Sequence, residues 1–314
     1  MGFTGKIDEL KSQMRIDPER LSLSVECFIR EHVEKLEREG TILGLSGGVD
    51  SAVVAALCER AVGVKNTLAL IMPDKDSTEE HVNDALSFAR QLGIETRLID
   101  ITAYLKQLGT YELFVLNKLP LPAKLRGILT KKAYGFYHRK TGETPFSSSI
   151  LGFKGKEFGS YLRKSNAYYR IKHRLRMLIL YLHAELENKL VVGAANKTEY
   201  KIGFFVKHGC DDAVDVMPIL NLYKTQVREL ARFLDIPSKI IEKAPSPDII
   251  PGIIDEEAIG ITYEKLDLIL LALKKEWQKV EIAKILEVEE KEVAHVMNLV
   301  QKSEHMRKLY SPQS

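Results

Sequence analysis

The chain contains only three cysteines, and no two of them lie close together in the sequence. Cys27, Cys58 and Cys210 form no CxxC pair, which argues against a disulfide framework or a zinc site and fits a reducing compartment. No apolar run approaches the roughly 20 residues that a membrane span needs, and the N-terminus has no apolar secretory core. We therefore expect a cytoplasmic protein that has no membrane partner.

An excess of charge of one sign is also lacking. The 46 Lys and Arg residues nearly balance the 43 Asp and Glu residues, for a formal net charge of +3, so the chain as a whole gives no electrostatic argument for binding nucleic acid. With 45% hydrophobic and 28% charged residues, the composition is that of a globular protein with enough apolar mass for a sizeable core. The length of 314 residues fits one large α/β domain or two small ones.

Short apolar segments alternate with helical patterns over much of the chain. Strands are predicted at 41–45, 67–72, 95–100 and 190–193, and helices at 52–61, 81–92, 167–186 and 223–234. This alternation predicts right-handed βαβ units and an α/β fold with a doubly wound, Rossmann-like parallel sheet. The first forty residues also have a helical pattern, which Pro18 interrupts, and the part from Tyr263 onward is predicted to be helical.

Residues 106–165 break this alternation. The segment carries many Lys and Arg residues and several turn-forming glycines and prolines, but only three acids, Glu112, Glu143 and Glu157. One interpretation is a basic lid, or a platform for an acidic partner or a larger substrate. The other is a surface excursion or dimer-interface elaboration without chemistry of its own. No recognisable RNA-binding motif is present, so nucleic acid is not the expected partner.

The most informative segment is the loop Leu45-Ser46-Gly47-Gly48-Val49-Asp50-Ser51, between a predicted strand and a predicted helix. Two adjacent glycines allow a tight turn that brings backbone N–H groups close to a ligand, and the helix directs its positive N-terminal end into the same space. Asp50 offers a carboxylate to a Mg²⁺ ion bridging phosphate oxygens. The loop lacks the GxxxxGK[ST] spacing, which excludes a Walker-type NTPase. A turn that merely caps the helix is the alternative.

This SGGxDS loop resembles the pyrophosphate-binding loop of the N-type ATP pyrophosphatases, which cleave ATP between its α and β phosphates. Later motifs resemble the ammonia-dependent NAD synthetases of that superfamily. The segment Gly193-Ala194-Ala195-Asn196-Lys197-Thr198-Glu199-Tyr200 is similar to that family's GTxNxxEY block. Further blocks follow in the family's order around Lys224, at 244–248, at 255–257, at 260–263, at 266–267 and at 303–307. The resemblance implies a single adenine nucleotide alpha hydrolase-like domain over 1–314, with the basic segment 106–165 inserted in it and a helical C-terminal part.

The resemblance also implies a reaction and its site residues. ATP would adenylate the nicotinate carboxylate of deamido-NAD, and ammonia would then displace AMP to give NAD, AMP and pyrophosphate. Asp50, Lys224 and Asp215 are the expected catalytic residues, and Asp50 and Glu199 the expected Mg²⁺ ligands. The expected ATP-binding residues are Gly44, Leu45, Ser46, Gly47, Gly48, Val49, Asp50, Ser51, Ala194, Lys224 and Ser246. The expected substrate-binding residues are Arg174, Lys207, Asp215, His305 and Met306.

Several positions depart from the family pattern. Ala194 stands where a threonine is expected, Arg170 and His173 replace the Asn and Ala of NxxARxRM, and Met306 replaces the Lys of the terminal HK pair. The block GDGxxD has become the longer Gly209-Cys210-Asp211-Asp212-Ala213-Val214-Asp215. Most departures fall on the deamido-NAD side, so two alternatives stay open: adenylation of a different carboxylate, and a catalytically weakened nucleotide- or tRNA-binding relative. Cys210 has no resolving cysteine nearby, which favours an inert thiol over a sulfur-transfer cysteine.

The nitrogen source and the assembly follow from what precedes the loop and from the resemblance. About forty residues stand before the loop, too few for a glutaminase module, so we expect free ammonia or a separate glutaminase to supply nitrogen. The resemblance implies a homodimer, because the family is dimeric.

Overall fold

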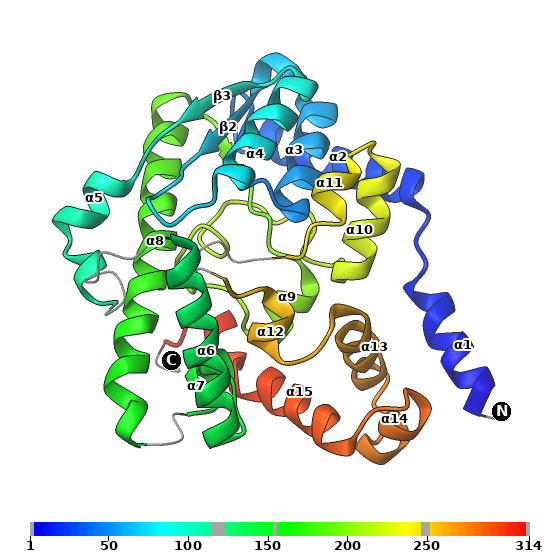
Figure 1. Cartoon of the computed structure of the whole chain (residues 1–314). Coiled ribbons are helices and arrows are strands. Elements are labelled where there is room, and N and C mark those ends of the chain that lie inside the picture. Colours follow the sequence, from blue (N-terminus) through cyan, green and yellow to red (C-terminus); the bar gives the residue numbers. More distant parts are fainter. Residues whose placement is uncertain (1–2, 115–122, 153–155, 246–251, 312–314) are drawn as a thin grey trace.

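The computed structural model describes residues 3–114, 123–152, 156–245 and 252–311, and its strands form one four-stranded parallel sheet (Figure 1). They are β1 (Thr41–Gly44), β2 (Thr67–Ile71), β3 (Glu95–Leu98) and β4 (Leu190–Val191), in the order β3-β2-β1-β4. Ile42 of β1 pairs with Leu68 on one side and Val191 on the other. A parallel bridge from Val192 to Val216 extends the sheet beyond β4. Each predicted strand is confirmed, although each ends slightly earlier than predicted.

Helices cover both faces of this sheet. On one face lie α2 (Pro18–Lys35), α3 (Val49–Val62), α4 (Glu79–Leu92) and α10 (Lys224–Phe233), and on the other α5 (Thr102–Gln107) and α8 (Gly159–Leu186). Side chains alternate between the faces along a strand. Leu43 and Ala69 therefore pack with the first group, while Ile42 and Leu68 pack with Leu180 of α8. The predicted doubly wound α/β sheet is confirmed.

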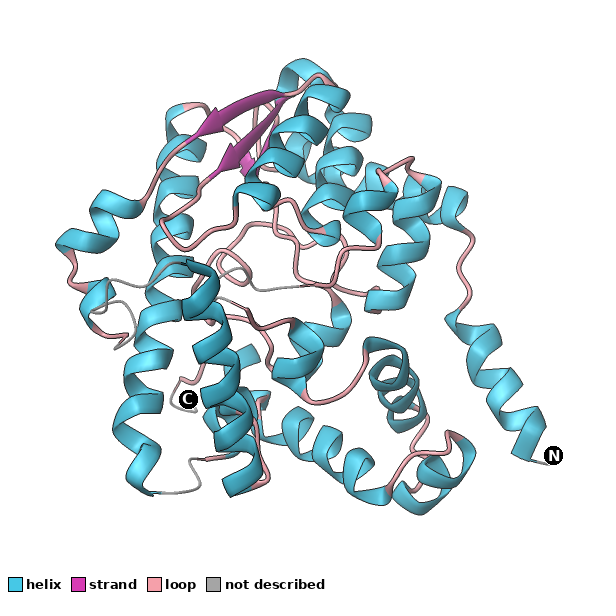
Figure 2. Cartoon of the chain, in the orientation of Figure 1, coloured by secondary structure: helices cyan, strands magenta, loops and turns pink. Residues whose placement is uncertain are grey.

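A second apolar cluster lies away from the sheet, in a part built only of helices and loops (Figure 2). Its helices are α1 (Phe3–Met14), α7 (Pro145–Leu151), α9 (Lys197–Ile202), α13 (Tyr263–Lys274), α14 (Lys279–Ile285) and α15 (Glu290–Lys302). Leu266, Ile269 and Leu270 form its buried stripe, which confirms the helical C-terminal part. Two short helices are α11 (Ser238–Ile241) and α12 (Asp255–Ile259), and 3-10 turns lie at Val64–Asn66, Thr110–Glu112, Lys156–Phe158 and Glu304–Arg307. No described helix is long and apolar enough to cross a membrane.

The described part of the basic segment 106–165 is largely helical. It contains α6 (Ala123–Thr141) and α7, and α8 begins at Gly159, so the predicted start of that helix at residue 167 is wrong. The Thr144 hydroxyl caps α7 by accepting from the Ser147 N–H (3.0 Å). The Tyr137 hydroxyl of α6 donates to the Ser148 hydroxyl (2.7 Å). The second of these bonds joins α6 to α7, and packing overrides the turn signals of the segment.

Candidate active site

The SGGxDS loop leaves β1 and runs into the first turn of α3. Gly47 has a φ of +79°, and a Cβ there would lie 2.2 Å from the His81 carbonyl oxygen, so only glycine fits this turn. The Ser51 hydroxyl donates to the Gly48 carbonyl (3.0 Å) and accepts from the Ser46 N–H (3.2 Å). Gly48 caps α3 without a side-chain hydrogen bond. The loop and the helix end therefore present backbone donors of the kind that bind phosphate.

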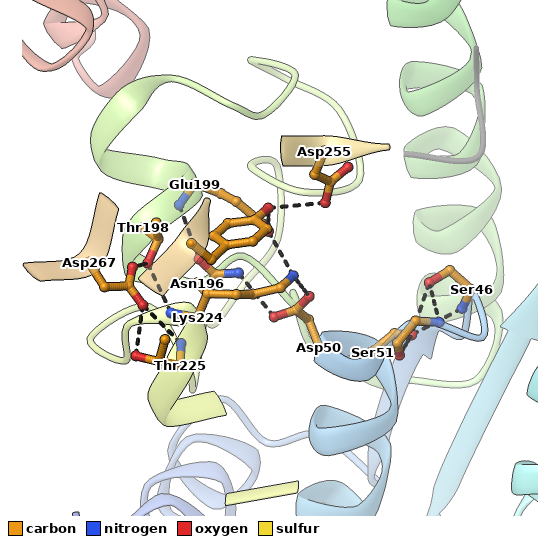
Figure 3. Close-up of polar contacts among 12 residues, drawn as sticks. Ser46, Asp50, Ser51, Asn196, Thr198, Glu199, Lys224, Thr225, Asp255 and Asp267 are labelled. Carbon is orange, nitrogen blue, oxygen red and sulfur yellow. Dashed lines mark hydrogen bonds and ion pairs between the residues drawn. The ribbon is translucent and has the colours of Figure 1, made fainter. Parts of the chain in front are cut away.

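Lys224 lies between two of the expected acidic residues (Figure 3). Its Nζ is 2.5 Å from Asp50 Oδ2 and 2.9 Å from Glu199 Oε1, and its side chain is only 2% exposed. Asn196 joins the two acids, since its Nδ2 donates to Asp50 Oδ1 (3.0 Å) and its Oδ1 accepts from the Glu199 N–H (3.0 Å) as the cap of α9. The starts of α3, α9 and α10 therefore bring together three expected site residues that are far apart in the sequence.

Asp255, the first residue of α12, adds a third carboxylate to this cluster. The Tyr263 hydroxyl lies 2.9 Å from Glu199 Oε1 and 3.0 Å from Asp255 Oδ2. Burial raises the pKa of Glu199 to about 7 and that of Asp255 to about 6. The negative charge of Asp50 adds to both shifts, while the positive charge of Lys224 opposes them. Burial acts to lower the pKa of Lys224, but Asp50 and Glu199 outweigh it and hold this pKa above its ordinary value. The ammonium group therefore stays charged.

A buried carboxylate, Asp267 of α13, fixes the helix ends behind the cluster. Its Oδ1 accepts from the Thr198 hydroxyl (2.5 Å), and its Oδ2 accepts from the Thr225 N–H (2.9 Å) and hydroxyl (2.8 Å). The Thr198 hydroxyl in turn accepts from the Lys224 N–H (2.9 Å). Burial raises the pKa of Asp267 to about 6. These bonds orient α9 and α10 so that Glu199 and Lys224 face each other.

The loop and the carboxylate cluster line one cavity of about 270 Å³. The expected ATP-binding residues that line it are Gly44, Leu45, Ser46, Gly48, Val49, Asp50, Ser51, Ala194 and Lys224. Gly47 forms the turn of the loop, and Ser246 lies outside the described residues. Glu199 and Asp255 line the cavity from the cluster side, and Arg176 and Lys243 add positive charge to its wall.

Asp215 lies at the edge of the sheet, beside β4. Its Oδ2 accepts from the Val191 N–H (2.8 Å), and its Oδ1 accepts from the Tyr181 hydroxyl (3.0 Å). Asp215 is exposed and is not among the residues that line the cavity. The geometry therefore does not bring this expected catalytic residue to the carboxylate cluster.

The other expected substrate-binding residues gather near the C-terminal segment. Lys207 Nζ donates to the carbonyls of His305 (2.9 Å) and Lys308 (2.7 Å), and Arg174 donates to the carbonyl of Lys207 (3.2 Å). Met306 is buried there, with 7% of its surface exposed. These expected residues share one region near the C-terminal segment, and none of them lines the cavity.

The carboxylate cluster fits a Mg²⁺ ion by its chemistry. Asp50 and Glu199 offer oxygen ligands, which Mg²⁺ prefers, and the Lys224 ammonium stands between them as a cation. Asp255 Oδ1 is buried and has no hydrogen-bond partner among the described residues, so one acceptor is left for a further cation.

Comparison with known proteins shows which family the chain resembles. The family model for NAD synthase matches residues 22–126 and 148–310. The chain belongs to the NAD synthase family. An NH3-dependent NAD⁺ synthetase of Thermotoga maritima is 44% identical over 277 residues, which cover 85% of this chain and 95% of that protein. The resemblance found in the sequence is confirmed.

Two solved structures have the fold of this NAD synthase family member. An NMN synthetase of Francisella tularensis superposes with a TM-score of 0.67 at 29% identity, covering 95% of this chain and 99% of that chain. An NH3-dependent NAD synthetase of Campylobacter jejuni, in complex with a nitrate ion, superposes with a TM-score of 0.65 at 25% identity, covering 95% and 100%. These matches confirm the adenine nucleotide alpha hydrolase-like fold.

The NAD synthase model leaves residues 127–147 unmatched, which is most of α6 and the start of α7. Tyr134, Pro145 and Phe146 of this part line a second cavity of about 110 Å³. Phe204 and Phe205 line both cavities. The unmatched part therefore forms a wall of the space next to the phosphate loop.

Proposed function

We propose that this protein is an NH3-dependent NAD synthetase, which adenylates the nicotinate carboxylate of deamido-NAD with ATP and then replaces AMP with ammonia. One observation carries the proposal: the phosphate loop, Asp50, Glu199 and Lys224 converge on one cavity in a member of the NAD synthase family. The loop suits the β and γ phosphates, which leaves the α phosphorus exposed to an acceptor.

The groups around the loop have separate tasks on ATP. The loop N–H groups and the N-terminus of α3 hold the terminal phosphates. The Lys224 ammonium offsets the negative charge that grows on the departing pyrophosphate. Asp50 and Glu199 would hold Mg²⁺, which supplies further positive charge at the phosphate oxygens when bound. Lys224 then turns from these carboxylates toward the phosphates, which its long flexible stem allows.

The two chemical steps balance without a dedicated general base. An oxygen of the acceptor carboxylate attacks the α phosphorus, the bond to the bridging oxygen breaks, and pyrophosphate leaves. The lone pair of ammonia then attacks the carbonyl carbon of the mixed anhydride, AMP leaves, and one proton passes to solvent. Holding the adenylate next to ammonia supplies most of the rate increase in the second step.

We further propose roles for the residues at the edge of the site. Ala194 lines the cavity, which supports an ATP contact, and the family-like block around Ser246 supports a second one. The shared location of Arg174, Lys207, His305 and Met306 supports one binding region for the dinucleotide part of the acceptor. For Asp215, the bonds to Val191 and Tyr181 support a structural part at the sheet edge.

Nicotinate mononucleotide is the second candidate acceptor. The structure of an NMN synthetase matches this chain over nearly its whole length, and the reacting nicotinate carboxylate is the same in both acceptors. The two differ in the AMP half, which deamido-NAD carries and the mononucleotide lacks. The departures at Arg170, His173 and the segment 209–215 fall on the acceptor side.

Pyrophosphate release tests the proposal. The purified protein is incubated with ATP, Mg²⁺ and ammonium, and with deamido-NAD, nicotinate mononucleotide or neither. We expect pyrophosphate, AMP and NAD with deamido-NAD, and a substitution of Asp50→Asn should remove all three. Greater activity with nicotinate mononucleotide would establish the second candidate. If the protein cleaves ATP with neither acceptor and binds RNA in a salt-sensitive way, both candidate functions are overturned in favour of a nucleotide- or tRNA-binding protein.

We also propose that the enzyme is a cytoplasmic homodimer that takes ammonia from solution or from a separate glutaminase. Widely spaced cysteines support the location, and the family resemblance supports the dimer. Light scattering after size-exclusion chromatography measures the molar mass of the protein in solution, which for a dimer is twice that of one chain. Glutamine alone should not replace ammonium in the assay with the purified protein, and equal rates with the two nitrogen sources would refute this part.

A further inference from the structure

A second cluster of ligand-type side chains lies in the same cavity, apart from the Lys224 cluster. His173 of α8, Cys210 and Asp211 each offer one ligand atom, and these atoms lie within 4.8 Å of one another. His173 Nδ1 is 3.4 Å from Cys210 Sγ and 2.8 Å from Asp211 Oδ2, and Cys210 Sγ is 3.7 Å from Asp211 Oδ1. All three residues line the cavity that contains the phosphate loop.

Backbone packing holds the two parts of this cluster together. The Cys210 N–H donates to the His173 carbonyl (3.2 Å). A Cβ at Gly209 would lie 2.9 Å from His173 Cβ, so the absence of a side chain lets the loop approach α8 this closely. The Asp212 carboxylate accepts from the His208 N–H (2.8 Å) and shapes the turn before the cluster. The site is therefore built on contacts of the folded backbone.

The geometry does not suit a nucleophilic cysteine. In a nucleophile–base–acid arrangement, one ring nitrogen takes the proton of the nucleophile and the other donates its N–H to the acid, so the acid and the nucleophile contact different nitrogens. Here Asp211 and Cys210 both approach Nδ1 of His173. Burial, together with the charge of Asp211, raises the pKa of the Cys210 thiol well above its ordinary value. The expectation that Cys210 is no sulfur-transfer group agrees with this arrangement.

We propose that His173, Cys210 and Asp211 form a binding site for a thiophilic divalent ion of the zinc class. A tetrahedral zinc ion has Zn–S bonds of about 2.3 Å and Zn–N bonds of about 2.0–2.1 Å, which put its ligand atoms roughly 3.3–3.6 Å apart. The separation of Cys210 Sγ from His173 Nδ1 (3.4 Å) falls in that range. The two oxygens of Asp211 lie on either side of it, with Oδ1 3.7 Å from Sγ and Oδ2 2.8 Å from Nδ1. On binding, Sγ releases its proton to solvent, Nδ1 binds through its lone pair, and the ring proton resides on Nε2.

The charges and the ligand types favour this class of ion over Mg²⁺. A thiolate is a soft ligand that selects zinc-like ions, whereas Mg²⁺ prefers oxygen. Arg176 also lines the cavity, and its charge opposes a cation, but the two anions that Cys210 and Asp211 supply outweigh it. The sequence argued against a zinc site because no cysteines are paired. The ligands instead come from segments 37 residues apart, which only the fold brings together.

Three protein ligands leave a fourth coordination position. Since all three residues line the cavity, this position faces the space where the proposed substrates bind. Water or an anionic oxygen suits it. The metal site is thus distinct from the proposed Mg²⁺ ligands Asp50 and Glu199, and it does not depend on the proposed synthetase reaction.

Titration with Co²⁺ tests the site without any turnover. Purified wild-type protein, free of nucleotide, should bind one equivalent of Co²⁺ with a thiolate-to-cobalt charge-transfer band in the near ultraviolet, and Zn²⁺ should displace the ion. Cys210→Ser should abolish the band, and His173→Ala should weaken binding by at least about 10–100-fold. Cys27→Ser, which changes an exposed cysteine elsewhere, is the matched control and should keep the band.

The same titration also shows how the proposal fails. Absence of the charge-transfer band from the wild-type protein, or its persistence in Cys210→Ser, would overturn the site. Asp50→Asn should keep the band, because oxygen ligands at the Mg²⁺ site give no thiolate transition. Circular dichroism shows whether each variant is folded. Since no product is measured, failure of the metal site and failure of the synthetase assignment are separate results.

Discussion

The substitution Glu199→Gln separates what the buried carboxylate cluster costs in folding stability from what it contributes to activity. Glu199 Oε1 accepts from Lys224 Nζ (2.9 Å) and from the Tyr263 hydroxyl (2.9 Å). The amide oxygen of glutamine accepts both bonds in the same place. Lys224 also keeps its pairing with Asp50. The substitution therefore removes one buried negative charge and changes little else, so its effect on stability reports the cost of that charge.

The magnitude follows from the pKa of Glu199. Burial, with a further contribution from Asp50, raises this pKa from 4.5 to about 7 in the folded protein. A carboxyl group with a raised folded-state pKa stabilises the fold while it is protonated. That contribution is complete below the unfolded pKa and is lost as the pH rises through the folded pKa. Each pH unit in this window corresponds to about 1.4 kcal/mol of unfolding free energy. As the pH rises through the window, wild-type protein therefore loses about 3 kcal/mol of stability, whereas the glutamine variant, which has no proton to lose, keeps it.

Urea unfolding without Mg²⁺ measures this difference. The variant should be about 3 kcal/mol more stable than wild-type protein at a pH above 7, and the two should agree below about pH 4.5. Added Mg²⁺ should stabilise wild-type protein more than the variant, and pyrophosphate release by the variant should fall by about 10²–10³-fold. Glu31→Gln, at an exposed position of α2, is the control. Equal pH slopes for the variant and the wild-type protein would refute the reasoning.

Three further substitutions test other parts of the site by urea unfolding and pyrophosphate release. Gly47→Ala should prevent the loop from closing and remove activity, since a Cβ would lie 2.2 Å from the His81 carbonyl oxygen. Its control is Gly109→Ala, where the backbone is left-handed (φ +66°) but no atom lies within 4 Å, and it should cost only about 1–2 kcal/mol. Asp267→Asn should cost about 1–3 kcal/mol because an amide donor then faces other donors, and unchanged stability would contradict the proposed bonds. Asp215→Ala should cost about 1 kcal/mol and lower activity only as far as the folded fraction falls, whereas a raised KM for the acceptor at full stability would show that Asp215 binds substrate.

The sheet and the phosphate loop could be predicted because their signals are local. A short apolar run such as 67–72 favours a buried strand whatever surrounds it, and paired glycines before a helix define the loop by backbone geometry alone. The family-like blocks added Glu199 and Lys224 to the predicted site residues. Their contact with Asp50 depends on three helix ends meeting, which no local pattern contains.

The residues that were missed carry no local sign of burial. Asp255 and Asp267 are acids at or near helix starts, where a solvated side chain is the ordinary interpretation. Both are buried in the folded chain, where the Tyr263 hydroxyl contacts Asp255 and Thr225 contacts Asp267. For both residues a signal was present, since Asp255 and Asp267 each belong to one of the family-like blocks. The helix α6 was hidden for a related reason: its contacts, such as that of Tyr134 with the Ala258 carbonyl (3.2 Å), are remote in sequence.

The charges around Lys224 predict how ATP enters the site. Three carboxylates, those of Asp50, Glu199 and Asp255, surround a single ammonium group, so the cluster without a metal ion repels a free polyphosphate. Asp50 and Glu199 would hold a Mg²⁺ ion bound together with ATP, whose charge would reverse this balance and leave Lys224 able to face the phosphates. Calorimetry should therefore show much weaker binding of ATP in EDTA than in Mg²⁺, and Glu199→Gln should narrow the difference because it removes one of the repelling charges. Equal affinity for ATP with and without Mg²⁺ would mean that Lys224, and not a metal ion, is the cation that the two carboxylates hold throughout the reaction.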